Sequence, residues 1–356
     1  MQPFLQFLIR RFFLIVFSLF VVTLVLYGGV MTIPADVRVE LYMSPNMKPD
    51  ITEEQLQNIK AKLIEQYHLD ESFPVQYGYW VASLFEGGWG YSPTLHEAVL
   101  PSLLRRTPVT AELTLYSFLL FVPLGLITGG SSGWKRNGAG DTIFRFVAFL
   151  GTSIPPFILS VILLAIFYVN IGWLAPGRLS QSLGFFVSGG EFTTYTGLLT
   201  IDGLLNKRPD IALDALKHLV MPVVTLSLYH WATLGRITRA TIIEQRRKGY
   251  VSAAVARGLS ERQVKWKHAF PNVLAPSMTS MALSAASLLT GVYVVEIIYN
   301  FKGISQVIVG AFNVLPDASA ALGFALYSVF LVLLLMFILD LLQAAFDPRV
   351  RDEIIR

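Results

Sequence analysis

Residues 318–339 read ASAALGFALYSVFLVLLLMFIL, a stretch that contains no Asp, Glu, Lys or Arg. At a rise of about 1.5 Å per helical residue, roughly 20 apolar residues cross the hydrocarbon core of a bilayer, which is about 30 Å thick. The stretch is long enough to do so, and it carries no charge that would be costly in lipid. It therefore predicts one membrane-spanning helix.

The rest of the chain contains five more uncharged blocks of this kind. They are Phe12–Met31, Leu113–Trp134, Phe146–Ile171, Leu219–Gly235 and Ala282–Val295. The composition agrees, because 54% of the 356 residues are hydrophobic and only 15% are charged, whereas a soluble domain has about 25% charged residues. We therefore expect an all-α polytopic membrane protein with about six transmembrane helices. The first block is longer than the apolar region of a signal peptide, about 7–15 residues, so we expect it to be retained.

Lysine and arginine gather on one side of this predicted arrangement. Basic residues flank membrane spans preferentially on the cytoplasmic side. Here they occur at positions 10 and 11, at 135, 136 and 145, densely between 236 and 267, and at 349, 351 and 356. We expect that side to be the cytoplasm, with both termini inside. Arg105 and Arg106 lie on the opposite side and run against the rule.

The spans divide the chain into four predicted parts. These are an N-terminal transmembrane helix (1–31), an extracytoplasmic segment (32–112), a core of five transmembrane helices (113–347) that includes a cytoplasmic loop (236–272), and a cytoplasmic tail (348–356).

Local signals add detail to this division. Within the extracytoplasmic segment, Thr52 and Gln55 form a capping-box pattern that predicts a helix running to about Tyr67. Residues 172–217 are rich in Gly, Ser and Thr and predict a second, partly ordered external loop. Prolines lie within or beside three spans, at 123, 155, 156 and 222, and predict bends there.

Several function classes are excluded or disfavoured. The chain has no cysteine, which excludes disulfides, thiolate metal sites and a cysteine nucleophile. Its net charge of +4 comes mostly from residues beside spans, so we expect no nucleic-acid partner. No Gly-x-x-x-x-Gly-Lys-Ser/Thr phosphate-binding loop occurs; the nearest run, Gly129–Lys135, lacks the Gly-Lys-Ser/Thr element. We expect no catalytic residue, cofactor or metal ion on this chain.

The cytoplasmic loop contains the most informative local sequence. Residues 252–256 are small and have good helix propensity, and Gly258 can end a helix in a left-handed cap. A helix with a small surface can enter a groove on a partner protein. The alternative, which the composition leaves open, is a solvated connector between two spans.

This loop resembles the cytoplasmic signature of permease subunits of binding-protein-dependent ABC importers. That signature reads Glu-Ala-Ala, three residues, Gly, nine residues, then Ile-x-Leu-Pro. Here the spacing is the same, and the matching elements are Ser252-Ala253-Ala254, Gly258 and His268-Ala269-Phe270-Pro271. Ser252, His268 and Phe270 replace the family's Glu, Ile and Leu, so contacts at those positions do not carry over unchanged.

The replacements are similar to the dipeptide/oligopeptide branch, whose relatives also carry oligosaccharides and nickel complexes. Ordered short strings support this branch: Ser153-Ile154-Pro155, Gly172-Trp173-Leu174, His218–Pro222, Val295–Ile298 before Gly303, and Phe346–Arg349. Ile33–Asp36 and Gly87–Ser92 depart from the usual external motifs. The departures leave the carried solute and the contacts with a solute-binding protein open.

The resemblance implies the permease fold of these importers and a set of partners. These are a homologous second permease, two cytoplasmic ATPase subunits that carry ATP and Mg²⁺, an extracytoplasmic solute-binding protein, and membrane lipid, in the inner membrane of a prokaryote. The residues expected to contact the ATPase are Ser252, Ala253, Ala254, Arg257, Gly258, Leu259 and Pro271. ATP-driven closure of the ATPases would move the helix at about residues 251–259 and switch the spans between inward-facing and outward-facing states.

Ionisable residues near the spans are the candidates for the solute pathway. We single out His230 and Glu296 for this role, with hydrogen bonding between helices as the alternative for His230. Glu112, Glu296 and Asp340 fall at span ends, where we expect them to reach interfacial water. Two other classes remain: an ion-gradient-driven secondary transporter using Glu296, Asp340 and His230, and a membrane scaffold or receptor that transports nothing.

Overall fold

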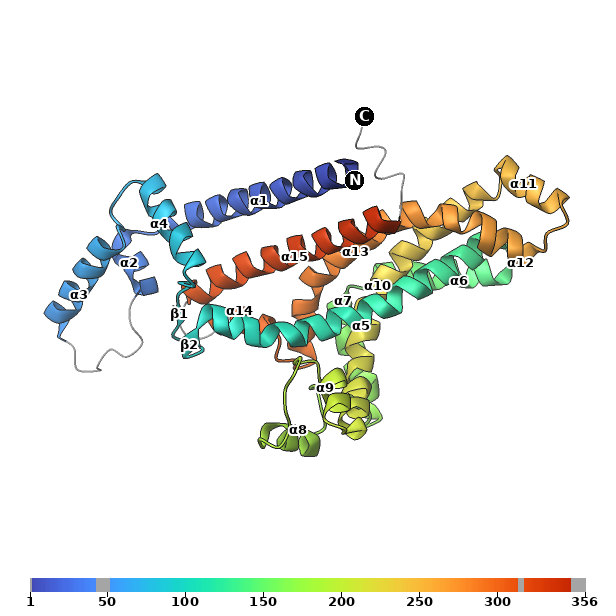
Figure 1. Ribbon diagram of the computed structural model, residues 1–356. Helices are drawn as coiled ribbons and strands as arrows, with labels where there is room; N and C mark the ends of the chain where they lie inside the picture. The colour runs from blue at the N-terminus through green and yellow to red at the C-terminus, as the bar shows by residue number, and fades with distance from the viewer. Residues whose placement is uncertain (1, 43–51, 313–316, 347–356) are drawn as a thin grey trace. The chain divides into compact units, whose positions relative to one another are not determined.

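The computed structural model describes residues 2–42, 52–312 and 317–346, which are almost entirely helical (Figure 1). The predicted tail (348–356) lies outside the described residues, as does the motif at Asp347–Arg349. The long helices are α1 (Gln2–Val30), α5 (Val99–Trp134), α6 (Ala139–Ser153), α10 (Pro209–Gln245), α13 (Pro271–Ile298) and α15 (Ala318–Phe346). Strands β1 (Tyr91–Ser92) and β2 (Glu97–Ala98) form a short antiparallel hairpin.

Shorter helices fill the connections. They are α2 (Ala35–Arg38), η1 (Val39–Tyr42), α3 (Glu53–Gln66), α4 (Phe73–Phe85), α7 (Pro156–Leu163), η2 (Leu164–Asn170), α8 (Gln181–Ser188), α9 (Leu199–Leu205), α11 (Gly249–Ala256), α12 (Glu261–Gln263), η3 (Val264–Ala269) and α14 (Ser305–Phe312). The capping-box prediction is confirmed, because Thr52 caps α3 and the Gln55 amide N donates to Thr52 Oγ1 at 3.4 Å.

Among the described residues, five helices are long and apolar enough to cross a membrane, and a bent pair makes six. This agrees with the expected number. The bent pair joins α6 to α7 and η2 through a bend of 100° at the Pro155-Pro156 dipeptide, which confirms the bend predicted there. Pro155 cannot donate a backbone hydrogen bond, and Pro156 is favoured at the first turn of the new helix.

Several helices, among them α5, α10 and α13, extend beyond the uncharged blocks that predicted them. α5 begins at Val99 instead of Leu113, α10 extends in both directions, and α13 begins at Pro271 instead of Ala282. The reason is that a search for uncharged residues finds only the part of a helix that lies in lipid. A helix continues into water wherever its backbone hydrogen bonds persist.

The segment 172–217, predicted to be external, is more ordered than predicted. Residues 172–217 contain α8, α9 and the first turns of α10, where a partly ordered loop was expected. A small apolar core explains the order, because Phe192, Leu199, Ile211 and Ala215 are buried together. Their spacing is too irregular to be recognised as one helix or strand.

The chain forms two compact units. Unit 1 comprises Met1–Phe4, Pro108–Gly303 and Leu334–Arg356, and unit 2 comprises Leu5–Thr107 and Ile304–Leu333. In unit 1, α10 is the central helix and contacts α6, α7, α9 and α13. α5 and α10 approach closely, since a Cβ added at Gly129 would lie 2.3 Å from the Gly235 carbonyl oxygen. Only glycine permits this separation.

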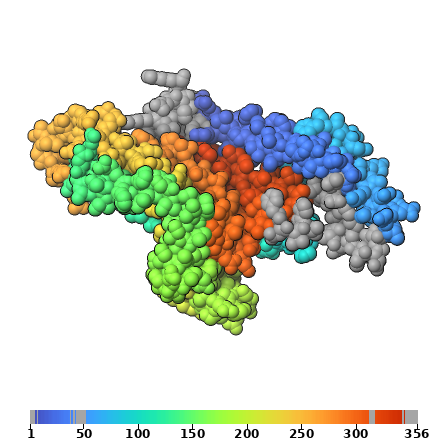
Figure 2. Space-filling model, turned by 180° about the vertical axis from the view of Figure 1, so that it is seen from behind, coloured from blue at the N-terminus to red at the C-terminus, as the bar shows by residue number. Residues whose placement is uncertain are grey.

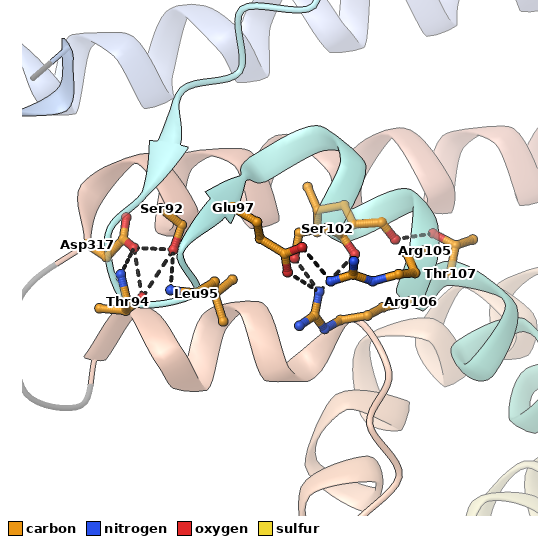
Figure 3. Close-up of polar contacts among 10 residues, drawn as sticks. Ser92, Thr94, Leu95, Glu97, Ser102, Arg105, Arg106, Thr107 and Asp317 are labelled. Carbon is orange, nitrogen blue, oxygen red and sulfur yellow. Dashed lines mark hydrogen bonds and ion pairs between the residues drawn. The ribbon is translucent and has the colours of Figure 1, made fainter. Parts of the chain in front are cut away.

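In unit 2, α4 packs against α1. Tyr27 stacks on Trp80 with ring centroids 4.9 Å apart, and Thr23 Oγ1 lies 2.8 Å from the Tyr77 hydroxyl. Figure 3 shows a second junction in this unit, between the β1–β2 hairpin and the start of α15. There the Asp317 carboxylate accepts hydrogen bonds from Ser92 Oγ at 2.5 Å and Thr94 Oγ1 at 2.8 Å. The carboxylate is buried, so it fixes the hairpin to the helix.

Candidate functional site

The segment that follows α10, residues 246–270, contains all the predicted coupling residues except Pro271, which begins α13; we call it the α11 segment. It lies at the opposite end of α10 from α8 and α9 (Figure 1). Figure 2 shows the same separation within unit 1, with the yellow-orange α11 region at one end and the yellow-green α8 region at the other. The long helix α10 thus separates two polar regions of unit 1.

α11 ends in the left-handed cap that the sequence predicts. Gly258 has φ +75°, its amide N donates to the Val255 carbonyl at 2.9 Å, and the Leu259 amide N donates to the Ala254 carbonyl at 3.4 Å. These two bonds define a Schellman motif, which needs a residue that tolerates positive φ. The prediction for Gly258 is confirmed as to its conformation.

The structure divides the predicted coupling residues into an exposed set and an inward-facing set. Val251 and Ala254 are buried in a cluster with Trp134, Ile242 and Val264, and Leu259 packs against that cluster. The exposed set consists of Ser252, Ala253, Arg257, Gly258 and Pro271. Ala254 and Leu259 therefore hold α11 in place, while the exposed residues remain accessible to another molecule.

Polar contacts tie the α11 segment to the end of α5. The Arg246 guanidinium donates to the Trp134 carbonyl at 2.6 Å, and the Trp134 indole N donates to Glu261 Oε1 at 2.7 Å. Lys265 Nζ donates to Ser131 Oγ at 2.8 Å. Burial of Lys265 lowers the pKa of its ammonium group, an effect that the Glu261 charge opposes and the Lys135 charge reinforces. These contacts join the α11 segment to the end of α5.

A buried ion pair next to this region was not predicted. The Asp141 carboxylate is 1% exposed and accepts two hydrogen bonds from Arg239 of α10, at 2.6 and 2.8 Å. It also accepts hydrogen bonds from Ser132 Oγ at 2.5 Å and from the Asn137 amide N at 2.9 Å. For Arg239 the sequence predicts only a position on the cytoplasmic side of the membrane. The one available signal was an isolated acid between Lys135, Arg136 and Arg145.

Glu296 is buried inside unit 1. The prediction that it reaches interfacial water is wrong, since it is 0% exposed and accepts a hydrogen bond from Thr110 Oγ1 at 2.5 Å. Its carboxylate occupies the space beside Gly303, where an added Cβ would lie 2.3 Å from Oε1. This contact explains why a glutamate and a glycine seven residues apart occur together in the matched string. The loop after α13 closes over the carboxylate.

Glu112 is also buried, at 2% exposure, which again contradicts the expectation of interfacial water. It accepts hydrogen bonds from Arg178 Nη2 at 2.6 Å, from the Thr200 amide N at 2.9 Å and from Thr200 Oγ1 at 2.8 Å. These partners lie in residues 172–217, so Glu112 anchors that segment to α5.

The remaining pathway candidates are buried as well. His230 is 6% exposed and lies against two aromatic rings, with centroid distances of 5.5 Å to Phe121 and 5.3 Å to Tyr229. Asp340 is 8% exposed, which contradicts its predicted position in interfacial water. His230, Glu296 and Asp340 are not adjacent groups of one cluster: among the described residues, no three His, Asp or Glu side chains come together as metal ligands could.

Comparison with known proteins shows which family the chain is similar to. Residues 122–352 match the family described as binding-protein-dependent transport system inner membrane component. The chain belongs to this family. The match covers α10, the α11 segment and α13, which are the elements that the resemblance in sequence singled out.

Curated relatives extend the similarity to nearly the whole chain. The di/tripeptide transport system permease protein of Pseudomonas aeruginosa is 31% identical over 350 residues, covering 98% of this chain and 99% of the relative. The probable D,D-dipeptide transport system permease protein of Escherichia coli is 32% identical over 293 residues, 82% of this chain and 84% of the relative. A dipeptide transport system permease protein of Lactococcus lactis is 29% identical over 355 residues, 97% and 99%.

Family membership decides between the function classes. The chain is a multi-pass inner-membrane permease subunit of a binding-protein-dependent ABC importer, and the ion-gradient-driven alternative is not favoured. The family implies ATPase and solute-binding-protein partners. The geometry of the α11 segment bears on which residues contact those partners.

Proposed function

We propose that this chain forms, together with a homologous second permease, the translocation path of a peptide importer. Two cytoplasmic ATPase subunits would bind and hydrolyse ATP with Mg²⁺, and an extracytoplasmic binding protein would deliver the peptide. Both termini and the α11 segment would face the cytoplasm. The names of the relatives support peptides as the solute class.

The coupling role is supported by one observation: α11 has one buried side and one exposed side. Its inner side is packed on Trp134 and Val264, and its outer side exposes the small residues Ser252, Ala253 and Gly258 beside Val255, which is 58% exposed. A helix of this kind can lie close to a partner surface and still transmit a push to the spans behind it. ATP binding can shift the permease between states only through contacts that differ between those states.

The test separates the bulk of a side chain from backbone strain. Ala253→Trp adds bulk on the exposed side without positive φ, whereas Gly258→Ala adds a strain of about 1 kcal/mol and almost no bulk. We expect Ala253→Trp and Gly258→Trp to abolish ATPase co-purification and ATP-driven peptide uptake, and Gly258→Ala to keep most of both.

The matched control is Gly140→Trp, because Gly140 is exposed on the same predicted side and an added Cβ there meets nothing within 4 Å. It should retain ATPase association and uptake. Normal association in the Ala253→Trp and Gly258→Trp variants would show that the α11 segment is a solvated connector and would overturn the coupling assignment.

Orientation can be tested by cysteine labelling, since the chain has no native cysteine. Arg257→Cys and Phe185→Cys place thiols at exposed positions near opposite ends of α10. In intact cells, a reagent that cannot cross the membrane should label position 185 and leave position 257 unmodified. The reverse pattern would show that the proposed orientation is inverted.

A further inference from the structure

Unit 2 contains a half-open cavity of about 470 Å³ that the coupling role does not use. Its volume lies within the range of roughly 300–1,000 Å³ that is typical of small-molecule sites. Five aromatic residues line it, together with Glu86 and residues from α4, the hairpin and α15; the aromatic residues are Tyr42, Tyr67, Trp80, Trp89 and Tyr91. The whole cavity lies within unit 2.

The cavity is electronegative for three separate reasons. Glu86 is the only charged lining residue, and within the described part of the chain its carboxylate has no hydrogen-bond or ion-pair partner. Ser83 and Leu84, also in the lining, belong to the last turn of α4, where the backbone carbonyls form the negative end of the helix dipole. The faces of the aromatic rings attract cations as well.

The surrounding segment reinforces this field. Residues 32–104 contain ten Asp or Glu and four Lys or Arg. Such an excess of one charge raises the local concentration of a ligand with the opposite charge. The cavity therefore suits a cationic ligand and disfavours an anionic one.

The lining residues are held in place before any ligand arrives. Trp80 stacks on Tyr27, Tyr42 stacks on Tyr67 with centroids 4.2 Å apart, and the Trp89 indole N donates to the Leu84 carbonyl at 3.1 Å. Figure 3 shows how Asp317 ties Ser92 to the start of α15, which fixes the wall made by the neighbouring residues 91 and 319. A preformed cage loses little entropy on binding.

We propose that this cavity binds the free α-ammonium end of a short peptide, with Glu86 as its counter-ion and the Trp80 and Trp89 rings as the walls of a cation cage. A compact ammonium group pairs with the Glu86 carboxylate and contacts the ring faces at once, in the negative field of the α4 helix end. The two or three residues that follow the ammonium group fit the remaining volume. The peptide as the source of the ammonium group rests on the proposed function.

The experiment uses the full chain in lipid nanodiscs and isothermal titration calorimetry. The probes are trialanine, N-acetyl-trialanine, which lacks the charge, and trialanine amide, which keeps it. We expect trialanine and its amide to bind with similar affinity and N-acetyl-trialanine to bind about ten-fold more weakly. Glu86→Gln should weaken trialanine by about the same factor and leave the acetylated peptide unchanged.

Glu54→Gln is the matched control, because Glu54 is an exposed acid of unit 2 outside the cavity, and it should bind like the unaltered chain. Equal affinity for the free and acetylated peptides, or an unchanged affinity in Glu86→Gln, would overturn the proposal. A parallel ATP-driven uptake assay of the assembled importer, with trialanine and a set of other short peptides, separates the two hypotheses. Uptake without amine-dependent binding refutes only the cavity, whereas failure of uptake for all peptides refutes the proposed function.

Discussion

The Asp141–Arg239 ion pair offers the sharpest test of how α6 is held to α10 next to the α11 segment. Asp141→Ala removes a carboxylate that is 1% exposed and accepts hydrogen bonds from three residues: Arg239, Ser132 and Asn137. The change leaves the Arg239 guanidinium, whose side chain is only 20% exposed, without its partner. Breaking a buried pair in this way typically costs about 3–5 kcal/mol. Because Arg239 retains some contact with water, we expect a loss of about 3 kcal/mol.

The pair can also be removed as a whole. Replacing a buried ion pair with apolar residues of similar volume is often nearly neutral, because the desolvation cost of both charges disappears. Asp141→Leu combined with Arg239→Met should therefore recover most of the stability lost in Asp141→Ala. This recovery separates the cost of an unpaired charge from the cost of lost packing.

The assay is reversible unfolding of the purified chain in mixed micelles, followed by circular dichroism. Asp210→Ala is the matched control, since it breaks an Asp–Arg pair at 2.7 Å whose side chains are 49% and 34% exposed. Exposed pairs contribute little to stability, because water screens both charges. A loss in Asp141→Ala no larger than that in Asp210→Ala would refute the reasoning, because it would show that burial does not strengthen the pair.

Three other predictions follow from close contacts and charge. Gly129→Leu should destabilise the chain by about 1–3 kcal/mol or more, because its Cβ would meet the Gly235 carbonyl oxygen at 2.3 Å, while Gly140→Leu should be silent; equal unfolding curves would contradict the α5–α10 contact. Gly303→Ala should displace the Glu296 carboxylate, and Glu296→Ala in the same chain should relieve the clash, which micelle unfolding can measure. Burial alone would raise the pKa of Glu97, but hydrogen bonds involving Arg106 and Ser102 and the charges of Arg106 and Arg105 lower it. Its stabilising contribution is therefore full above the ordinary carboxylate pKa of about 4.3 and is lost as the pH falls through the lower folded-state pKa. The difference in melting temperature between the unaltered chain and Glu97→Gln should shrink below about pH 4, and a constant difference would refute the ion pair's role.

Much of this protein follows from its sequence because the relevant signals are local. A run of uncharged residues predicts a span because charge is costly in lipid. Thr52 and Gln55 predict the start of α3 because the capping hydrogen bonds join residues only three positions apart. Gly258 predicts a left-handed cap for the same reason, since the conformation of one residue decides it. The spacing around Gly258 also led to the family, which the comparison confirmed.

The roles of the buried charges, by contrast, were decided only in three dimensions. Glu112 and Glu296 fall at span ends, where the sequence favours contact with water, yet each accepts hydrogen bonds inside unit 1 from a residue 88 or 186 positions away. Asp141 and Arg239 are 98 positions apart, and the sequence around one residue does not predict the other as its partner. Composition alone predicts that such residues contact water or lie on one side of the membrane. Only the packing of the helices determines their partners. A buried charge is tolerated where the fold places hydrogen-bond donors or acceptors beside it.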